Sequence, residues 1–198
     1  MSLKHAPILI KQLDGSARSL LLRHMLRLSV DDIRMRFGGR QTEASVTAYV
    51  DRIDFNRDTL YGVFDYDLAL TGVTHVGMGE EAEFGVSVLP AFRGRGIGTA
   101  LFERAEEHAT NNMISTFFVH TLTENKPMLA IARKRKMRII TEAGEADCFL
   151  NLPRPDVGTI TSEFLQDRVA LFDFALKAQV MAARTISNAL VPRPKLAS

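Results

Sequence analysis

A glycine-rich loop between an apolar strand and a helix constrains this chain more than any other feature. Residues 83–101 read EFGVSVLPAFRGRGIGTAL, a strand pattern followed by a short loop and the first turn of a helix. Glycines let a ligand approach the backbone without obstruction from Cβ atoms, and a first helical turn offers unpaired N–H groups and a positive dipole end. Together these features form a cradle for pyrophosphate, to which guanidinium groups add positive charge. The residues of the cradle are Arg93, Gly94, Arg95, Gly96 and Gly98.

The rest of the sequence predicts one α/β domain of mixed α+β type. Three runs rich in β-branched and aromatic residues, separated by turn signals, predict consecutive antiparallel strands. Two other strands precede helical crossovers, so the sheet must be mixed. The expected helices cover 16–28, 29–37, 42–53, 97–110 and 127–136, and the expected strands cover 8–13, 59–64, 68–76, 81–89, 116–121, 139–143 and 146–152. We therefore expect a mostly antiparallel twisted sheet of about seven strands, flanked by helices, within residues 1–152.

A long amphipathic helix is expected after this domain. Two prolines mark a linker over residues 153–161, and a continuous helix is expected over 162–190. Its apolar residues follow a seven-residue spacing that Gln179 interrupts, and a helix this apolar must dock on the domain or on another chain. Packing within the chain and a homodimer through this helix both remain open. Residues 191–198 are expected to form a flexible tail.

Composition excludes several classes of protein. The single cysteine, Cys148, cannot form an intrachain disulfide framework or a zinc site of several thiolates, and no metal is expected. No apolar run approaches the roughly 18 residues of a membrane helix, and the start of the chain lacks the apolar stretch of a signal peptide. We therefore expect a cytoplasmic protein with no membrane partner. The net charge of +2 is too small to predict a nucleic-acid partner.

The spacing of the glycines separates this loop from other phosphate-binding motifs. The run at 94–98 is G-x-G-x-G after antiparallel strands, not the G-x-G-x-x-G of dinucleotide-binding folds, and no Lys-Ser/Thr completes a Walker motif. Residues 93–98 do match the signature Arg/Gln-x-x-Gly-x-Gly/Ala, and here the chain resembles the GNAT N-acetyltransferase superfamily. The resemblance extends to the order of elements from Ile8 to Leu152. It implies the acyl-CoA N-acyltransferase fold.

The resemblance implies acetyl-CoA as the acyl donor and an amine as the acceptor. Backbone amides of the loop would hold the CoA pyrophosphate, and main-chain groups of the preceding strand would pair with the pantetheine arm. Asn125 matches an asparagine that often contacts CoA in this family, and a role as a helix cap is equally open and compatible. The residues implied in CoA binding are Val86, Val88, Arg93, Gly94, Arg95, Gly96, Gly98, Thr99 and Asn125.

Two residues are candidates for the general base. An amine is mostly protonated at pH 7 and must lose a proton before it attacks, often through water. Glu83 is the first candidate, because several protein-lysine acetyltransferases carry a glutamate before the equivalent strand residues. His120 lies in a strand and could accept a proton near neutral pH, and Glu80 and Glu81 are nearby alternatives. A structural or solvated role is the alternative for each of them.

The sequence departs from the family at the residue that protonates the CoA thiolate. Many relatives carry a tyrosine in the helix after the fifth strand, and alignment from Asn125 places Ala132 there. A thiolate is a tolerable leaving group near neutral pH, so the absence of this acid does not forbid catalysis. The alternative function is a non-catalytic acyl-CoA-binding module that regulates a partner.

The acceptor remains open between a protein lysine and a small amine. The segment from Leu28-Ser29 to Arg36-Phe37 resembles the Leu-Ser…Arg-Phe segment of protein-lysine acetyltransferase domains. We expect the acceptor cleft between residues 31–53 and the fifth strand. The basic run at 133–136 is either a solvated helix face or an attraction for the CoA 3′-phosphate or an acidic partner.

Overall fold

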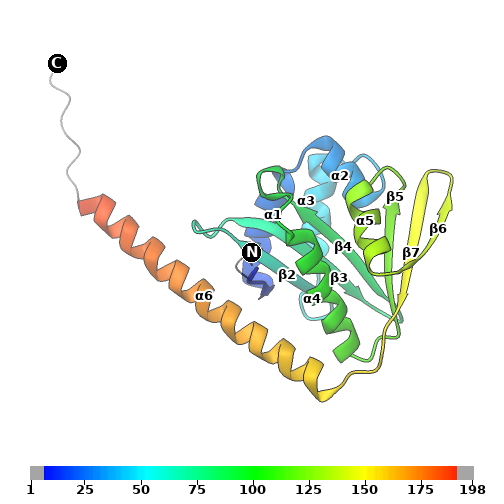
Figure 1. The fold of residues 1–198 in the computed structure, drawn as a ribbon. Helices are drawn as coiled ribbons and strands as arrows, with labels where there is room; N and C mark the ends of the chain where they lie inside the picture. Colours follow the sequence, from blue (N-terminus) through cyan, green and yellow to red (C-terminus); the bar gives the residue numbers. More distant parts are fainter. Residues whose placement is uncertain (1–6, 191–198) are drawn as a thin grey trace, which may run out of the picture.

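Seven strands form one sheet in the order β1-β2-β3-β4-β5-β7-β6. The computed structural model describes residues 7–190 (Figure 1). The strands are β1 (Lys11–Leu13), β2 (Thr59–Phe64), β3 (Leu70–Met78), β4 (Ala82–Val88), β5 (Thr116–Leu122), β6 (Arg138–Glu142) and β7 (Glu145–Asn151). Neighbouring strands are antiparallel, except that β4 and β5 are parallel. The expected mixed, mostly antiparallel sheet is confirmed.

Helices cover both faces of the sheet. They are α1 (Arg18–Leu26), α2 (Val30–Phe37), α3 (Glu43–Arg52), α4 (Ile97–Asn111) and α5 (Lys126–Lys134). Figure 1 shows α1, α2 and α3 on one face and α4 and α5 on the other. Local signals fix where several begin and end: Ser29 and Asp32 form a capping box at the start of α2, and Thr42 caps α3. Gly38, in the left-handed conformation at φ 72°, ends α2.

The apolar core forms a layer on each face. Towards α4 and α5, the rings of Phe84, Phe102 and Phe117 pack with centroids 5.0–5.4 Å apart. On the other face, buried residues of α1 and α3 pack against β2 and β3. Because side chains alternate along a strand, the neighbours of Phe84 in β4, Glu83 and Gly85, face α2 and α3. This second face is where polar side chains gather.

Several boundaries differ from those expected: the strand expected over 8–13 covers only Lys11–Leu13, and the strand expected over 68–76 covers Leu70–Met78. The turn between β6 and β7 is Ala143-Gly144, both in the left-handed region at φ 48° and 91°, because Glu142 already pairs with Glu145. The last helix, α6 (Val157–Leu190), begins earlier than residue 162, because Asp156 caps it by accepting a hydrogen bond from the Thr159 N–H at 2.9 Å. The helix therefore takes up part of the segment expected to be a linker. The expected tail, 191–198, lies outside the described residues.

Helix α6 packs on the domain from Thr159 to Lys177. Arg104 of α4 donates to Glu163 at 2.8 Å and to Asp167 at 2.7 Å, and Phe174 packs on Phe64 with ring centroids 4.9 Å apart. The end of the helix extends past the sheet (Figure 1). The outer side of the whole helix leaves large apolar residues exposed, among them Leu165, Val169, Phe172, Leu176 and Ile186. No helix in the described part of the chain is long and apolar enough to cross a membrane.

Candidate functional site

Strands β4 and β5 run side by side at one end and separate at the other. Residue pairs between them end at Glu83–Phe118, although β4 continues to Val88. On its other side β4 remains paired with β3 as far as Val88. The β5-facing edge of residues 84–87 has no strand partner within residues 7–190. Its N–H and C=O groups can therefore pair with an extended ligand, as an added strand would.

The glycine loop connects this strand to helix α4. Gly94 and Gly96 adopt φ values of 73° and 82°, which other residues rarely adopt. Gly96 precedes the helix, and no side chain caps the first turn. Gly98 lies within that turn, where an added Cβ would make only ordinary contacts, the nearest with Ile131 at 3.7 Å. The first N–H groups of α4 are thus available to an anion.

A cavity of about 550 Å³ joins the open edge of β4 to the glycine loop. Most of the residues expected to bind CoA line it: Val86, Val88, Arg93, Gly94, Gly96, Gly98, Thr99 and Asn125. Arg95 is not among the lining residues. Its guanidinium lies over the ring of Phe92, 5.2 Å from the centroid, and donates to the Ala91 carbonyl at 3.1 Å. The opposite wall includes Asp32 and Arg36 of α2, which were not predicted from the sequence to belong to this site.

Arg93 is held between the loop and helix α2. Its Nη2 lies 2.7 Å from Oδ1 of Asp32, and its Nε donates to the Val88 carbonyl at 3.0 Å. Burial raises the pKa of Asp32, but hydrogen bonds from Ser29 and Arg93 outweigh that effect and hold the pKa below its usual value. The carboxylate is therefore ionised at neutral pH. This pair fixes the guanidinium at the mouth of the cavity.

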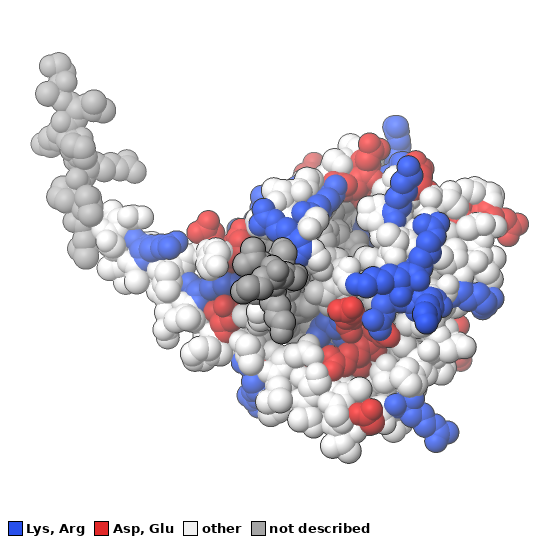
Figure 2. All heavy atoms as spheres, in the orientation of Figure 1, with Lys and Arg blue, Asp and Glu red and all other residues white. Residues whose placement is uncertain are grey.

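Asn125 caps α5, which is one of the two roles that the sequence left open. Its Oδ1 accepts a hydrogen bond from the Met128 N–H at 3.2 Å and so caps α5, and its Nδ2 donates to Thr121 at 2.9 Å. The same residue lines the cavity. Figure 2 shows basic side chains gathered over α5 and carboxylates over the adjacent α4. In the basic run, Arg135 pairs with Glu106 at 2.6 Å, whereas Lys134 lines the cavity.

The two candidate bases do not line this cavity. Glu83 is exposed on β4, on the face covered by α2 and α3. His120 follows Phe118 by two residues in β5, and its Nδ1 lies 2.8 Å from Oδ1 of Asp147. Its Nε2 lies near Gly38, 3.5 Å from where a Cβ on that glycine would be. The structure thus places both residues on the same face of the sheet, outside the residues that line the cavity.

A chain of four polar side chains, here called the Arg36 network, covers β4 on that face. Arg36 Nη2 donates to the Tyr49 hydroxyl at 3.1 Å, and that hydroxyl lies 2.6 Å from Nδ1 of His75. His75 Nε2 lies 3.1 Å from a carboxylate oxygen of Asp58, without an aligned hydrogen bond among the described residues. Burial, followed by the charge of Arg36, lowers the pKa of His75 despite the nearby carboxylate. The neutral His75 ring therefore accepts a hydrogen bond from the Tyr49 hydroxyl at Nδ1.

This network was not predicted from the sequence, because its members come from four separate elements. Tyr49 occupies an apolar position of a helix, and His75 sits in a strand of apolar residues. Asp58 lies in the turn before β2. Arg36 and Tyr49 lie in the segment 31–53, where the sequence predicts the acceptor cleft, but nothing in the sequence indicates that they meet. Contacts between distant segments carry no local signature.

Comparison with known proteins gives this geometry a family. The family model described as the Acetyltransferase (GNAT) family matches residues 29–137. The chain belongs to the GNAT acetyltransferase family. No curated protein matches the sequence significantly.

Solved GNAT structures share the fold at low sequence identity. The GNAT domain of S. lividans PAT is 18% identical, with a TM-score of 0.62 over 72% of this chain and 89% of that one. The PaiA N-acetyltransferase of Thermoplasma acidophilum, solved with coenzyme A, is 14% identical, with a TM-score of 0.54 over 72% and 98%. The ribosomal-protein-S18-alanine N-acetyltransferase of Escherichia coli is 14% identical, with a TM-score of 0.55 over 75% and 95%. These likenesses establish the fold.

At the position that the sequence aligned with the family's tyrosine acid, this GNAT chain has a residue of the apolar core. Ala132 of α5 is fully buried in the core beside Met128 and Leu129. Cys148 is also buried, in β7, where burial raises the pKa of its thiol. Within residues 7–190, no group of three or more His, Cys, Asp or Glu side chains could hold a metal ion.

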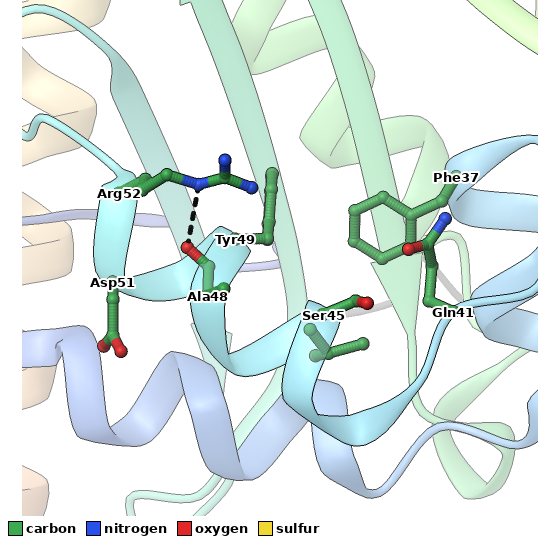
Figure 3. Close-up of a pocket in the computed structure, with 8 residues that line it drawn as sticks. Phe37, Gln41, Ser45, Ala48, Tyr49, Asp51 and Arg52 are labelled. Atoms are coloured by element: carbon green, nitrogen blue, oxygen red, sulfur yellow. Dashed lines mark hydrogen bonds between the residues drawn. The ribbon is translucent and has the colours of Figure 1, made fainter.

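A second hollow of about 600 Å³ lies along α3 (Figure 3). Its lining includes Phe37, Gln41, Ser45, Tyr49 and Arg52. These residues fall within the segment 31–53, where the sequence predicts the acceptor cleft. Tyr49 belongs both to this hollow and to the Arg36 network, and Arg36 also lines the first cavity. The network therefore stands between the two hollows.

Proposed function

We propose that this protein is an N-acetyltransferase that moves the acetyl group of acetyl-CoA to a primary amine by direct attack. The observation that carries the proposal is the cavity that joins the open edge of β4 to the start of α4. The backbone at Val86 and Val88 would pair with the pantetheine arm. N–H groups from Arg95 to Thr99 would hold the pyrophosphate, and Asn125 would contact CoA. The shape and chemistry of these residues fit a long, anionic, strand-like substrate.

In the proposed reaction, Glu83 is the general base. It accepts a proton from the acceptor ammonium, directly or through water, so that the nitrogen lone pair becomes free. The amine then attacks the thioester carbonyl carbon, a C–N bond forms, the C–S bond breaks, and CoA leaves as a thiolate. The Val88 N–H would stabilise the oxygen as negative charge develops. With Ala132 in place of an acid, the thiolate takes its proton from solvent, which its ordinary pKa allows.

The acceptor is either a protein lysine or a small amine, reached through the hollow along α3. We also propose that two copies of the chain pair through α6, whose exposed apolar residues repeat at alternating spacings of three and four. In a parallel pair of helices, Arg168 of one copy would face Asp173 of the other. This charge pairing favours a second copy of the chain as the occupant.

The test of the donor site is calorimetric titration with acetyl-CoA of the wild type and of Gly98→Glu. Gly98 is preferred to Gly96, because Gly96 has a positive φ and any side chain there would strain the backbone. The new carboxylate would stand among the N–H groups of the first turn and repel the pyrophosphate, and we expect affinity to fall about 100-fold or more. Gly15→Glu, in open space away from the site, is the matched control and should bind normally. Absence of binding by folded wild type would refute the acetyltransferase assignment.

The test of catalysis is release of free CoA in the presence of an amine panel. Glu83→Gln should retain acetyl-CoA binding and lose about 100-fold or more in kcat, the usual contribution of a general base. Glu142→Gln, an exposed carboxylate of β6 that is not a candidate base, is the control and should keep the wild-type rate. Equal rates for Glu83→Gln and wild type would remove Glu83 from the mechanism. Tight binding of acetyl-CoA with no turnover of any amine would favour an acyl-CoA-binding regulatory module instead.

A further inference from the structure

We propose that Arg36 binds a carboxylate group of the acceptor, so that the acceptors of this protein are small amines that are also carboxylic acids. The inference rests on the proposed acetyl transfer and narrows its substrate class. It assigns a role to a charged residue that stands between the two hollows and that the donor site does not require.

Arg36 lies directly on the backbone of β4. A Cβ added at Gly85 would stand 2.2 Å from the guanidinium, so only glycine at this position admits the side chain. Arg36 also lines the first cavity together with Val86 and Val88. Its charge is therefore held beside the strand at which the thioester is proposed to lie.

The guanidinium has no ionic partner in the described chain. Within residues 7–190 no carboxylate oxygen lies within 4.0 Å of it, and its buried Nε has no hydrogen-bond partner. Two residues earlier on the same helix, Arg34 pairs with both Asp31 and Glu124. Glu83 and Asp58 lie on this face, but neither pairs directly with the guanidinium, and a carboxylate fits a guanidinium through two parallel hydrogen bonds. Arg36 thus offers an anion site that the chain itself does not fill.

The site is organised before any ligand arrives. The Tyr49 hydroxyl accepts a hydrogen bond from Arg36 and therefore donates its own hydrogen bond to His75, which lies beside Asp58. The rings of Phe37 and Tyr49 pack beside the guanidinium, whose Cζ lies 5.1 Å and 5.9 Å from their centroids. Tyr49, His75 and Asp58 are positioning residues that hold Arg36 in one orientation.

The charges on this face match an amino acid rather than a simple amine. Glu83 and Gly85, the glycine under Arg36, are two residues apart on β4 and face the same side, so their Cα atoms lie about 7 Å apart along the strand. An acceptor with an ammonium near Glu83 and a carboxylate on Arg36 would satisfy both charges. An amine without a carboxylate would leave Arg36 unpaired.

The experiment compares amino acids with their amides as acceptors. Glycine, β-alanine and γ-aminobutyrate would be assayed for CoA release against the corresponding amides, with wild type, Arg36→Met and Arg40→Met. We expect the wild type to favour the best acid over its amide by about 10- to 100-fold in kcat/KM, as charge-assisted hydrogen bonds would give. Arg36→Met should lose this preference, mainly through a higher KM for the acids. Arg40, exposed and outside both hollows, is the matched control and should behave as wild type.

Two further measurements keep the inference separate from the proposed function. Gly85→Ala displaces the guanidinium without removing its charge and should also lose the preference for acids. Calorimetric titration of the protein with the same acids and amides, with and without CoA, reads carboxylate binding without turnover. Binding of acids by wild type and not by Arg36→Met would support the site even if no acetyl transfer were found.

Three outcomes would overturn the inference. If acids and amides react equally while acetyl-CoA still binds, Arg36 has no role in acceptor choice and the acetyltransferase proposal stands. If succinyl-CoA replaces acetyl-CoA as the best donor and Arg36→Met abolishes that advantage, Arg36 recognises the acyl group instead. If a lysine peptide exceeds every free acid in kcat/KM, the acceptor is not a small acid.

Discussion

At the scale of single residues, the buried side chain of His24 links strands β3 and β4. Its Nδ1 donates a hydrogen bond to the Leu70 carbonyl at 2.8 Å, and its Nε2 lies 2.8 Å from the hydroxyl of Ser87. Ser87 lines the cavity between β4 and the glycine loop. Because Nδ1 must carry the proton, neutral Nε2 accepts from Ser87. Burial lowers the pKa of His24 from 6.5 to about 4, although the hydrogen bond to Leu70 opposes this.

This pKa makes stability depend on pH in a predictable direction. The unfolded chain binds a proton at His24 below pH 6.5 and the folded chain does not until about pH 4, so the free energy of unfolding falls as pH falls through that window. Between pH 7.5 and 5, wild type should lose about 2 kcal/mol more than His24→Gln. Urea unfolding at both pH values measures the difference. Parallel pH dependences for the two proteins would show that His24 is not buried as described.

At the scale of elements, one cluster of charged side chains attaches α6 to the domain. The Arg104 side chain is only 1% exposed, and its guanidinium lies over the ring of Tyr61, 4.4 Å from the centroid. Glu163 accepts hydrogen bonds from Arg104, from Asn111 and from the His108 ring. Burial raises the pKa of Glu163, but these hydrogen bonds outweigh it and bring the pKa to about 2.

Glu163→Gln should weaken this attachment. Arg104 would then keep only Asp167 as a short ionic partner, and the lowering of the Glu163 pKa from 4.5 to about 2 corresponds to a loss of about 3 kcal/mol in the free energy of unfolding at pH 7. The contribution of Glu163 is present above pH 4.5 and is lost as pH falls towards 2, so the variant and wild type should converge in acid. Thermal and urea unfolding test both statements. Asp173→Asn, in a partly exposed pair with Lys177 on the same helix, should cost less than about 0.5 kcal/mol, and an equal loss in the two variants would contradict the anchoring role.

At the scale of the whole molecule, α6 has two different sides. One side is bound to α4 and β1, and the other exposes apolar residues at the spacing of a helix pair. Light scattering of the full-length chain should therefore give about twice its 22.0 kDa mass. Replacing Phe172 and Leu176 together with glutamate should give a monomer, since four charges would meet in the apolar seam. Thr185→Glu, off that seam, is the control, and a monomeric wild type would contradict the proposed dimer.

Features that depend on neighbouring residues could be predicted from the sequence. The capping box of α2, the left-handed Gly38, the strand spans and the glycine loop all follow from local backbone chemistry, which a short segment contains in full. The family signature at residues 93–98 lies within one such segment. For the same reason, the order of elements and eight of the residues that line the first cavity could be inferred from the sequence.

Which charges are buried, and which distant residues meet, depends on how the chain packs. Arg104 has the spacing of a solvated helix residue, and only the docking of α6 buries it. Arg36, Tyr49 and His75 come from three elements whose contacts depend on how α2 and α3 cross the sheet. Burial and electrostatic partners are properties of the packed chain, because they arise between segments that are far apart in the sequence.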